Sequence, residues 1–156
     1  MRIQIENRQS RHKVLKRPLR KIARKILSVS GYPDAELSIL ILDDAGIREI
    51  NRDYLQRDRP TNVISFAMQE GEGADLHPLV LGDVVISAER AAQDAHEAGV
   101  PFEHELWFLL IHGILHLVGY DHERGTLQEA ERMEAREREI FALLLQEFRL
   151  QRNDNG

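Results

Sequence analysis

The stretch PFEHELWFLLIHGILHLVG, residues 101–119, decides how this chain folds. Its apolar side chains fall on most sides of a helix, so we predict a central buried helix over about 101–118. Pro101 stands where a helix can begin, and Gly119 stands where it can end. A helix that is apolar on most sides must be covered by the other elements of the domain.

Shorter sequence patterns elsewhere in the chain predict the strands and helices that cover this central helix. Alternating or β-branched residues predict strands, whereas helical periodicity and capping residues predict helices. Pro18 either lies in the first turn of its helix or kinks it. The prediction is an α+β domain with one mixed sheet of about four strands and about five helices. The expected strands are 2–6, 37–42, 61–66 and 79–86. The expected helices are 13–29, 45–55, 88–98, 101–118 and a last helix that begins near Thr126. In the last helix we expect four apolar side chains to face the core: Met133, Ile140, Leu144 and Phe148.

Composition narrows the class of protein. The chain has 156 residues, which predicts a single domain over 1–150 with a polar tail at 151–156. No apolar run is long enough for a membrane span, and the N-terminus has no signal-like apolar region, so a cytoplasmic location is expected. The absence of cysteine excludes disulfides, thiolate metal sites and cysteine nucleophiles.

Charge is distributed unevenly. The net charge is −5, which gives no general affinity for nucleic acid. Nine Lys or Arg nevertheless occur from Arg8 to Lys25 without one acid. This basic segment either neutralises RNA phosphates over residues 11–25 or forms a solvated helix face. Residues 129–138 alternate in charge at helical spacing and are expected to form an exposed, salt-bridged face.

Three histidines point to a metal. His112 and His116 are four residues apart, so their rings lie on one face of the helix. Gly119 can reverse the chain, which would bring back His122 as a third ligand. A lone histidine on an apolar helix is usually a core residue, but three at this spacing favour a zinc site with one position open to water. We therefore predict one Zn²⁺ per chain.

The same spacing occurs in metzincin proteases, whose motif carries a general-base glutamate directly after the first histidine. This chain has Gly113 at that position. Ordinary zinc-peptidase chemistry would therefore lack its proton acceptor.

Three motifs together carry a family resemblance: HGILHLVGYDH at 112–122, PTNVISF at 60–66 and LGDVVI at 81–86. In their order along the chain, these motifs resemble the YbeY family of metal-dependent endoribonucleases, over about residues 37–145. The resemblance implies a zincin-like α+β fold, a single zinc on His112, His116 and His122, and cleavage of single-stranded RNA. It also implies maturation of the 3′ end of small-subunit (16S) rRNA, ribosome quality control and contact with the small ribosomal subunit. Many members carry an active-site arginine where this chain has Leu55, after Tyr54.

Other polar residues are candidates for catalysis. Arg57 and Arg59 could pair with phosphate, or they could be solvated loop residues. Asp121 could orient a ligand histidine, accept a proton or act as a cap. His104 could line the same cleft or lie on the surface. Asp83 lies in an apolar strand and would cost energy if it were buried unpaired, so we expect it to have a specific partner.

The sequence thus favours a zinc-dependent endoribonuclease acting on single-stranded rRNA. Two alternatives stay open. One is a zinc hydrolase of another bond, such as a peptidase, and the other is a ribosome-binding factor whose metal only braces the fold.

Overall fold

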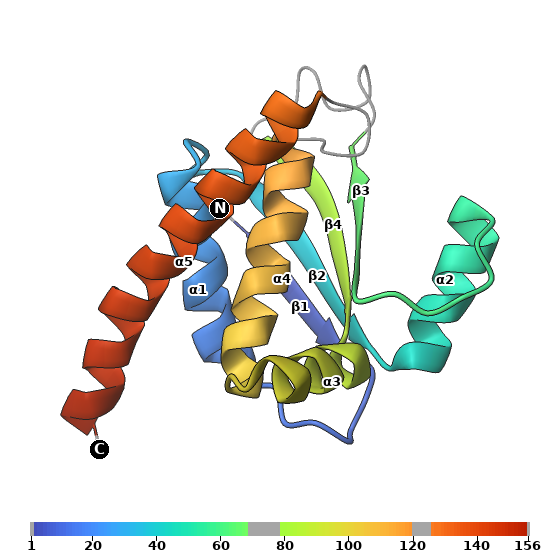
Figure 1. The fold of residues 1–156 in the computed structure, drawn as a ribbon, viewed down its shortest axis with the longest axis horizontal. Helices are drawn as coiled ribbons and strands as arrows, with labels where there is room; N and C mark the ends of the chain where they lie inside the picture. The colour runs from blue at the N-terminus through green and yellow to red at the C-terminus, as the bar shows by residue number, and fades with distance from the viewer. Residues whose placement is uncertain (1, 69–78, 120–125, 156) are drawn as a thin grey trace.

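A four-stranded mixed sheet forms the centre of the protein (Figure 1). The computed structural model describes residues 2–68, 79–119 and 126–155, with side chains through residue 148. The strands lie in the order β1-β2-β4-β3. The first three of these run parallel, and β3 pairs antiparallel with β4 at one edge. Their bounds are β1 Ile3–Asn7, β2 Glu36–Leu42, β3 Val63–Ala67 and β4 Val80–Ser87.

Five helices complete the described part of the chain, so the predicted α+β class with a mixed four-stranded sheet is confirmed. Helix α5 continues through residue 155, beyond the predicted start of a polar tail at 151. The helices are α1 Lys16–Val29, α2 Asp44–Leu55, α3 Ala88–Ala98, α4 Phe102–Leu117 and α5 Leu127–Asn155.

Local signals set the helix ends. Asp43 caps α2, because its side chain accepts a hydrogen bond from the Gly46 amide at 2.7 Å. Ser87 caps α3 through the Arg90 amide at 3.1 Å, and Gly99 ends that helix in the left-handed conformation. Pro18 lies in the first turn of α1, so the first of the two predicted alternatives is correct.

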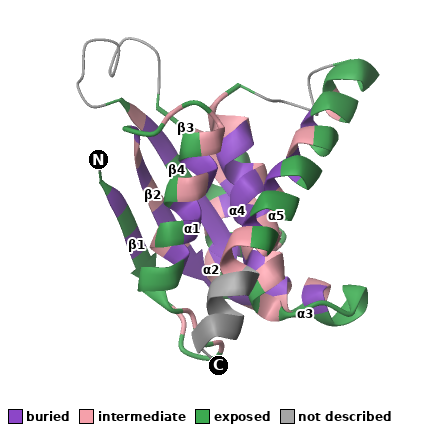
Figure 2. Cartoon of the chain, turned by 90° about the vertical axis from the view of Figure 1, so that its left-hand side faces the viewer, coloured by how far each residue is buried: buried purple, intermediate pink, exposed green. Residues whose placement is uncertain are grey.

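The main core lies between the sheet and α4, with α1, α3 and α5 around it (Figure 2). Leu110, Ile111 and Ile114 of α4 are completely buried, as the apolar stretch predicts. Helix α2 lies on the other face of the sheet over a smaller cluster, made by Leu42, Ile47, Ile64 and Val85. The two faces of the sheet are therefore covered unequally.

Two expectations from the sequence are wrong. Asp83 is exposed, and its side chain has no hydrogen-bond or ion-pair partner among the described residues, because its position in β4 points to the sheet face that α2 covers only in part. The predicted exposed face at residues 129–138 contains Glu137, which is only 5% exposed. A buried carboxylate on α5 requires a partner, and the partner is a histidine of α4.

In the part of the chain that the structure describes, no helix is both long enough and apolar enough to span a bilayer.

Candidate metal centre

The last two turns of α4 bring His112 and His116 together. The two residues are one helical turn apart, and their ring centroids lie 4.6 Å from each other. Their Nε2 atoms are separated by 3.1 Å. Both residues are only partly exposed, since the neighbouring positions on α4 are buried in the core. The helix therefore holds two imidazole nitrogens at one point of the surface.

This spacing fits a metal ion. Tetrahedral zinc with nitrogen bonds of 2.0–2.1 Å places two ligand nitrogens about 3.3 Å apart. The observed Nε2 separation is close to that value, and neutral imidazole is a preferred ligand of zinc and other transition metals. The donor type and the distance thus suit a metal shared between His112 and His116.

Glu137 of α5 fixes one of these rings. Its Oε2 atom lies 2.9 Å from His112 Nδ1, and the Glu137 side chain is 6% exposed. A carboxylate in this place accepts a hydrogen bond from an Nδ1–H group, and the corresponding tautomer of His112 carries on Nε2 the lone pair that a metal ligand needs. A carboxylate behind a ligand histidine is the usual arrangement in metalloproteins.

Sequence reasoning missed Glu137, although a signal was present. Glu137 follows Met133 by four residues and precedes Ile140 by three, so it lies on the inward stripe of α5. A carboxylate in an otherwise apolar stripe indicates a buried polar contact.

Gly113 faces the sheet rather than the histidine pair. A Cβ atom at this position would lie 2.7 Å from Val84 Cγ1 and 3.2 Å from Ser65 Oγ. The Ser65 hydroxyl also donates to the Gly113 carbonyl at 3.0 Å, which ties α4 to β3. A side chain here would push α4 off the sheet. The glutamate of metzincins therefore has no room at this position.

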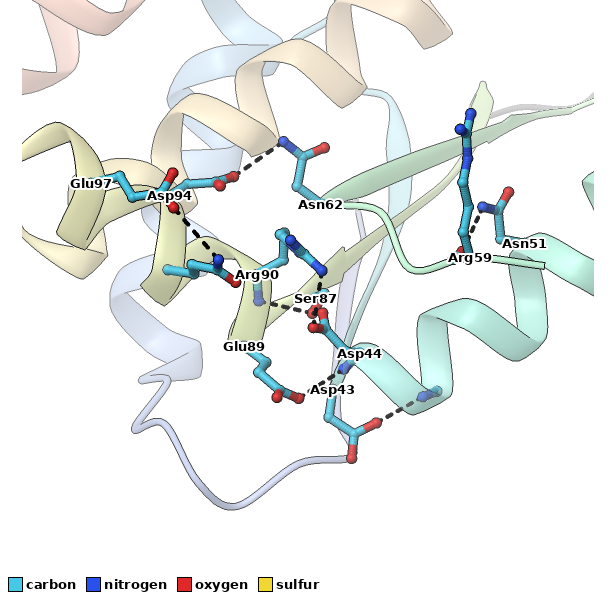
Figure 3. Close-up of polar contacts among 12 residues, drawn as sticks. Asp43, Asp44, Asn51, Arg59, Asn62, Ser87, Glu89, Arg90, Asp94 and Glu97 are labelled. Carbon is cyan, nitrogen blue, oxygen red and sulfur yellow. Dashed lines mark hydrogen bonds and ion pairs between the residues drawn. The ribbon is translucent and has the colours of Figure 1, made fainter. Parts of the chain in front are cut away.

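Arg57 and Arg59 lie on the loop between α2 and β3, where both are exposed. The buried Asn51 side chain donates to the Arg59 carbonyl at 2.9 Å, which fixes the backbone of the loop (Figure 3). Among the described residues neither arginine forms an ion pair, and no recorded contact joins either to the histidine pair. Both are available to an anionic ligand.

The neighbouring Asp58 already has a partner. Its carboxylate accepts a hydrogen bond from Arg48 Nε at 2.8 Å, and this bond lowers the pKa of Asp58. Asp58 therefore stays ionised and paired to α2, so it does not neutralise the arginines on either side of it.

The start of β3 is anchored by Asn62. Its side chain donates to Asp94 of α3 at 3.3 Å, and its carbonyl accepts from the Ser87 amide at 3.0 Å (Figure 3). Burial and the Asp94 carboxylate raise the pKa of the nearby Glu105. These contacts fix the end of the loop that carries Arg59.

The remaining candidates divide between surface and core. His104 packs against Trp107 and Phe141, at ring-centroid distances of 5.0 and 6.1 Å. Tyr54 is 71% exposed, and Leu55 ends α2 as an exposed residue.

The third predicted ligand, His122, and the candidate Asp121 lie outside the described residues. Gly119, which was predicted to end α4, has a φ of +115°. Residues 2–68, 79–119 and 126–155 contain no group of three metal-ligating side chains, so the predicted three-histidine site is represented there by its first two members.

Known proteins resemble this chain over nearly its full length. A family model described as endoribonuclease YbeY matches residues 4–145. Proteins named endoribonuclease YbeY from Syntrophotalea carbinolica and Geobacter sulfurreducens are 65% and 62% identical to it, over 94% and 92% of this chain and 97% and 96% of theirs. A Thermotoga maritima protein with a structure determined in solution is 25% identical, with a TM-score of 0.68 over 99% of this chain and 96% of that one.

Proposed function

The chain belongs to the endoribonuclease YbeY family, and from that premise we propose that it is a metal-dependent endoribonuclease acting on single-stranded RNA. One observation carries the proposal beyond the family name. The Nε2 atoms of His112 and His116 converge to 3.1 Å, with the buried Glu137 behind the first ring. Two imidazole nitrogens at this distance, with a carboxylate behind the first ring, are arranged as two ligands of one metal ion would be.

The proposed metal is one zinc per chain, held by His112, His116 and His122. All three donors are imidazoles and the chain has no cysteine, which favours zinc in a catalytic rather than a structural type of site. When bound, zinc supplies Lewis-acid chemistry at a phosphodiester.

The residues around the pair have separate tasks. Glu137 keeps the His112 proton on Nδ1 and fixes the orientation of the ring. Gly113 supplies no side chain that could serve as a general base next to His112. We therefore assign the handling of the proton to Asp121, which is adjacent to His122 in the sequence.

Arg57 and Arg59 are proposed to bind the phosphates of the substrate. Both are exposed, and a guanidinium group can pair with two phosphate oxygens. The carbonyl of Arg59 is fixed by Asn51, so its side chain starts from a defined position. Many family members have arginine at the position of Leu55, and Arg57 and Arg59 are the first basic residues that follow this position in the sequence.

The proposed substrate is the 3′ region of the small-subunit 16S rRNA, with the small ribosomal subunit as partner. This places the protein in the cytoplasm, where ribosomes are assembled. The relatives are named endoribonucleases, which supports ribonuclease activity, and the choice of rRNA as substrate rests on the family resemblance.

Cleavage assays on metal-free and zinc-reconstituted protein test the proposal. We expect the zinc-loaded protein to cut a labelled single-stranded RNA, to leave the matching duplex intact and to lose activity in chelator. A peptide library provides the competing substrate.

Cleavage of peptides with RNA left intact would replace the proposal with a peptidase. Loss of the fold on chelation, with no cleavage at any metal level, would replace it with a ribosome-binding factor that uses a structural metal.

A further inference from the structure

The basic segment at the N-terminus is only partly neutralised inside the protein. Four of its nine cations have partners: Arg8 with Glu6, Arg11 with Glu89, Arg20 with the Ile3 carbonyl and Lys25 with Glu147. The other five are exposed, and no ion pair is recorded for them in the described part of the chain. They are Lys13, Lys16, Arg17, Lys21 and Arg24.

Three of these cations form a stripe along α1. Arg17, Lys21 and Arg24 follow the i, i+4, i+7 pattern and so share one helix face, which spans about 10 Å. The opposite face is buried in the core through Leu19, Ile22 and Ile26, each at most 4% exposed. We call Arg17, Lys21 and Arg24 the α1 stripe. Its cations lie about 5–6 Å apart along the helix axis.

The first turn of α1 carries positive charges that oppose the helix macrodipole. It contains Lys16 and Arg17, no acidic residue and no side-chain cap at Leu15. The helix macrodipole favours acids at this end, so the basic residues here weaken α1. A local choice that lowers helix stability is typical of a surface that binds a partner.

Helix α1 is attached to the element that supports the metal centre. Arg136 of α5 donates a hydrogen bond to the Val29 carbonyl at the end of α1, and Arg136 directly precedes Glu137. Lys25 pairs with Glu147 of α5 at 3.0 Å, and α5 crosses both α1 and α4 in Figure 1. The α1 stripe and the histidine pair therefore belong to one helical layer, with the Arg24 end of the stripe nearer to the centre.

From these contacts we propose that the α1 stripe binds phosphates of the RNA that flank the cleaved bond. The inference rests on the proposed function for the identity of the substrate. Phosphate contacts of this kind position a strand without reading its sequence. In a protein with a net charge of −5, a localised stripe also orients an approaching polyanion.

The buried face of α1 argues against a membrane partner. A helix that lies on a membrane inserts its apolar side between lipids while basic residues contact the headgroups. In α1 the apolar side is occupied by the core, so only the charged side can reach a partner. Charge complementarity without an apolar contact fits a nucleic-acid backbone.

The test compares two triple variants with equal loss of charge. The first is Arg17→Gln/Lys21→Gln/Arg24→Gln, and the control is Arg2→Gln/Arg52→Gln/Arg138→Gln, which removes exposed arginines from the N-terminal end, α2 and α5. Binding of a long and a short single-stranded RNA is measured in chelator, so that the readout does not depend on cleavage. Circular dichroism verifies the fold of each variant.

We expect the α1 variant to lose about 100-fold in affinity for the long RNA at ~0.1 M salt, because each lost phosphate contact removes about 0.7 from the slope of log affinity against log salt. The short RNA, which cannot reach the stripe from the site, should bind all proteins alike.

An equal loss in both triple variants would show a general charge effect and overturn the proposal, as would unchanged binding in the α1 variant. Sedimentation with anionic phosphatidylserine vesicles that depends on the α1 stripe, with RNA binding intact, would assign the surface to a membrane instead. Failure of the proposed function appears separately, as RNA that is bound by the stripe but never cut.

Discussion

The histidine pair and the arginine loop are held in different ways. His112 and His116 extend from a helix whose neighbouring residues are buried, and Glu137 contacts the first ring directly. Arg57 and Arg59 belong to an exposed loop in which only the backbone is fixed, by Asn51 and by the residues around Asn62. The two histidine rings are therefore held in a fixed arrangement, whereas the side chains of the two exposed arginines can adapt to a ligand. Substitutions should therefore act sharply in the first region and gradually in the second.

The largest effect is expected from His116→Ala. Removal of one of two converging ligands should abolish RNA cleavage and zinc binding, while the fold remains because the apolar core does not include the metal. Rate, metal content and melting temperature are recorded on the same preparation. His96→Ala, which removes an exposed histidine from α3, is the control. A folded His116→Ala protein that cleaves at the wild-type rate would remove the pair from the mechanism.

Glu137→Gln tests whether the support of the first ring matters. The variant keeps the size of the side chain but weakens the acceptor of the His112 Nδ1–H bond, so zinc affinity should fall about 10–100-fold. Competition with a chromophoric chelator measures the affinity. Glu134→Gln changes an exposed acid on the same helix and should bind zinc as the wild type does. Equal affinities in the two variants would mean that Glu137 is a packing residue only.

Gly113→Ala should act on stability. The new Cβ would approach Val84 Cγ1 to 2.7 Å, and such overpacking typically costs about 1–3 kcal/mol. Urea denaturation of the metal-free protein measures the change. Adding Val84→Ala should restore part of the loss, because it removes the two methyl groups nearest to the new atom. No recovery in the double variant would place the clash elsewhere.

The sequence predicted the elements well and the contacts between them poorly. The apolar stretch at 101–119 acts locally, so its pattern is visible in one dimension. The caps that the structure shows at Asp43 and Ser87, and the stop at Gly99, are local in the same way. Glu137 and Gly113 owe their roles to distant partners, His112 and Val84. Asp83 was misplaced for the same reason, since its exposure depends on how little of the sheet α2 covers.

Arg59→Ala tests the exposed loop that carries Arg57 and Arg59. If Arg59 contacts one phosphate, the slope of log affinity against log salt should fall by about 0.7, with a modest loss of cleavage rate. The control is Arg52→Ala, an exposed arginine of α2 that pairs with the adjacent Asp53. A slope unchanged from the wild type would show that Arg59 is a solvated loop residue.

The smallest effect is expected from Glu105→Gln, a change on α4 near Asp94. Burial first, and the Asp94 carboxylate second, raise the pKa of Glu105, so the folded protein disfavours the ionised form. The wild type should therefore lose stability as the pH rises through that pKa, and the glutamine variant should not show this loss. Melting temperatures at acid and neutral pH provide the comparison. Parallel pH profiles for the two proteins would contradict this sign.

The central claim is that a metal ion lies between the two converging imidazoles of α4. A crystal of the zinc-reconstituted protein, with anomalous data collected on both sides of the zinc edge, measures this directly. The account predicts one anomalous peak per chain, about 2.0–2.1 Å from Nε2 of His112 and of His116, with His122 as a third ligand. A map without a peak at these atoms, or with zinc bound only elsewhere on the chain, would contradict it.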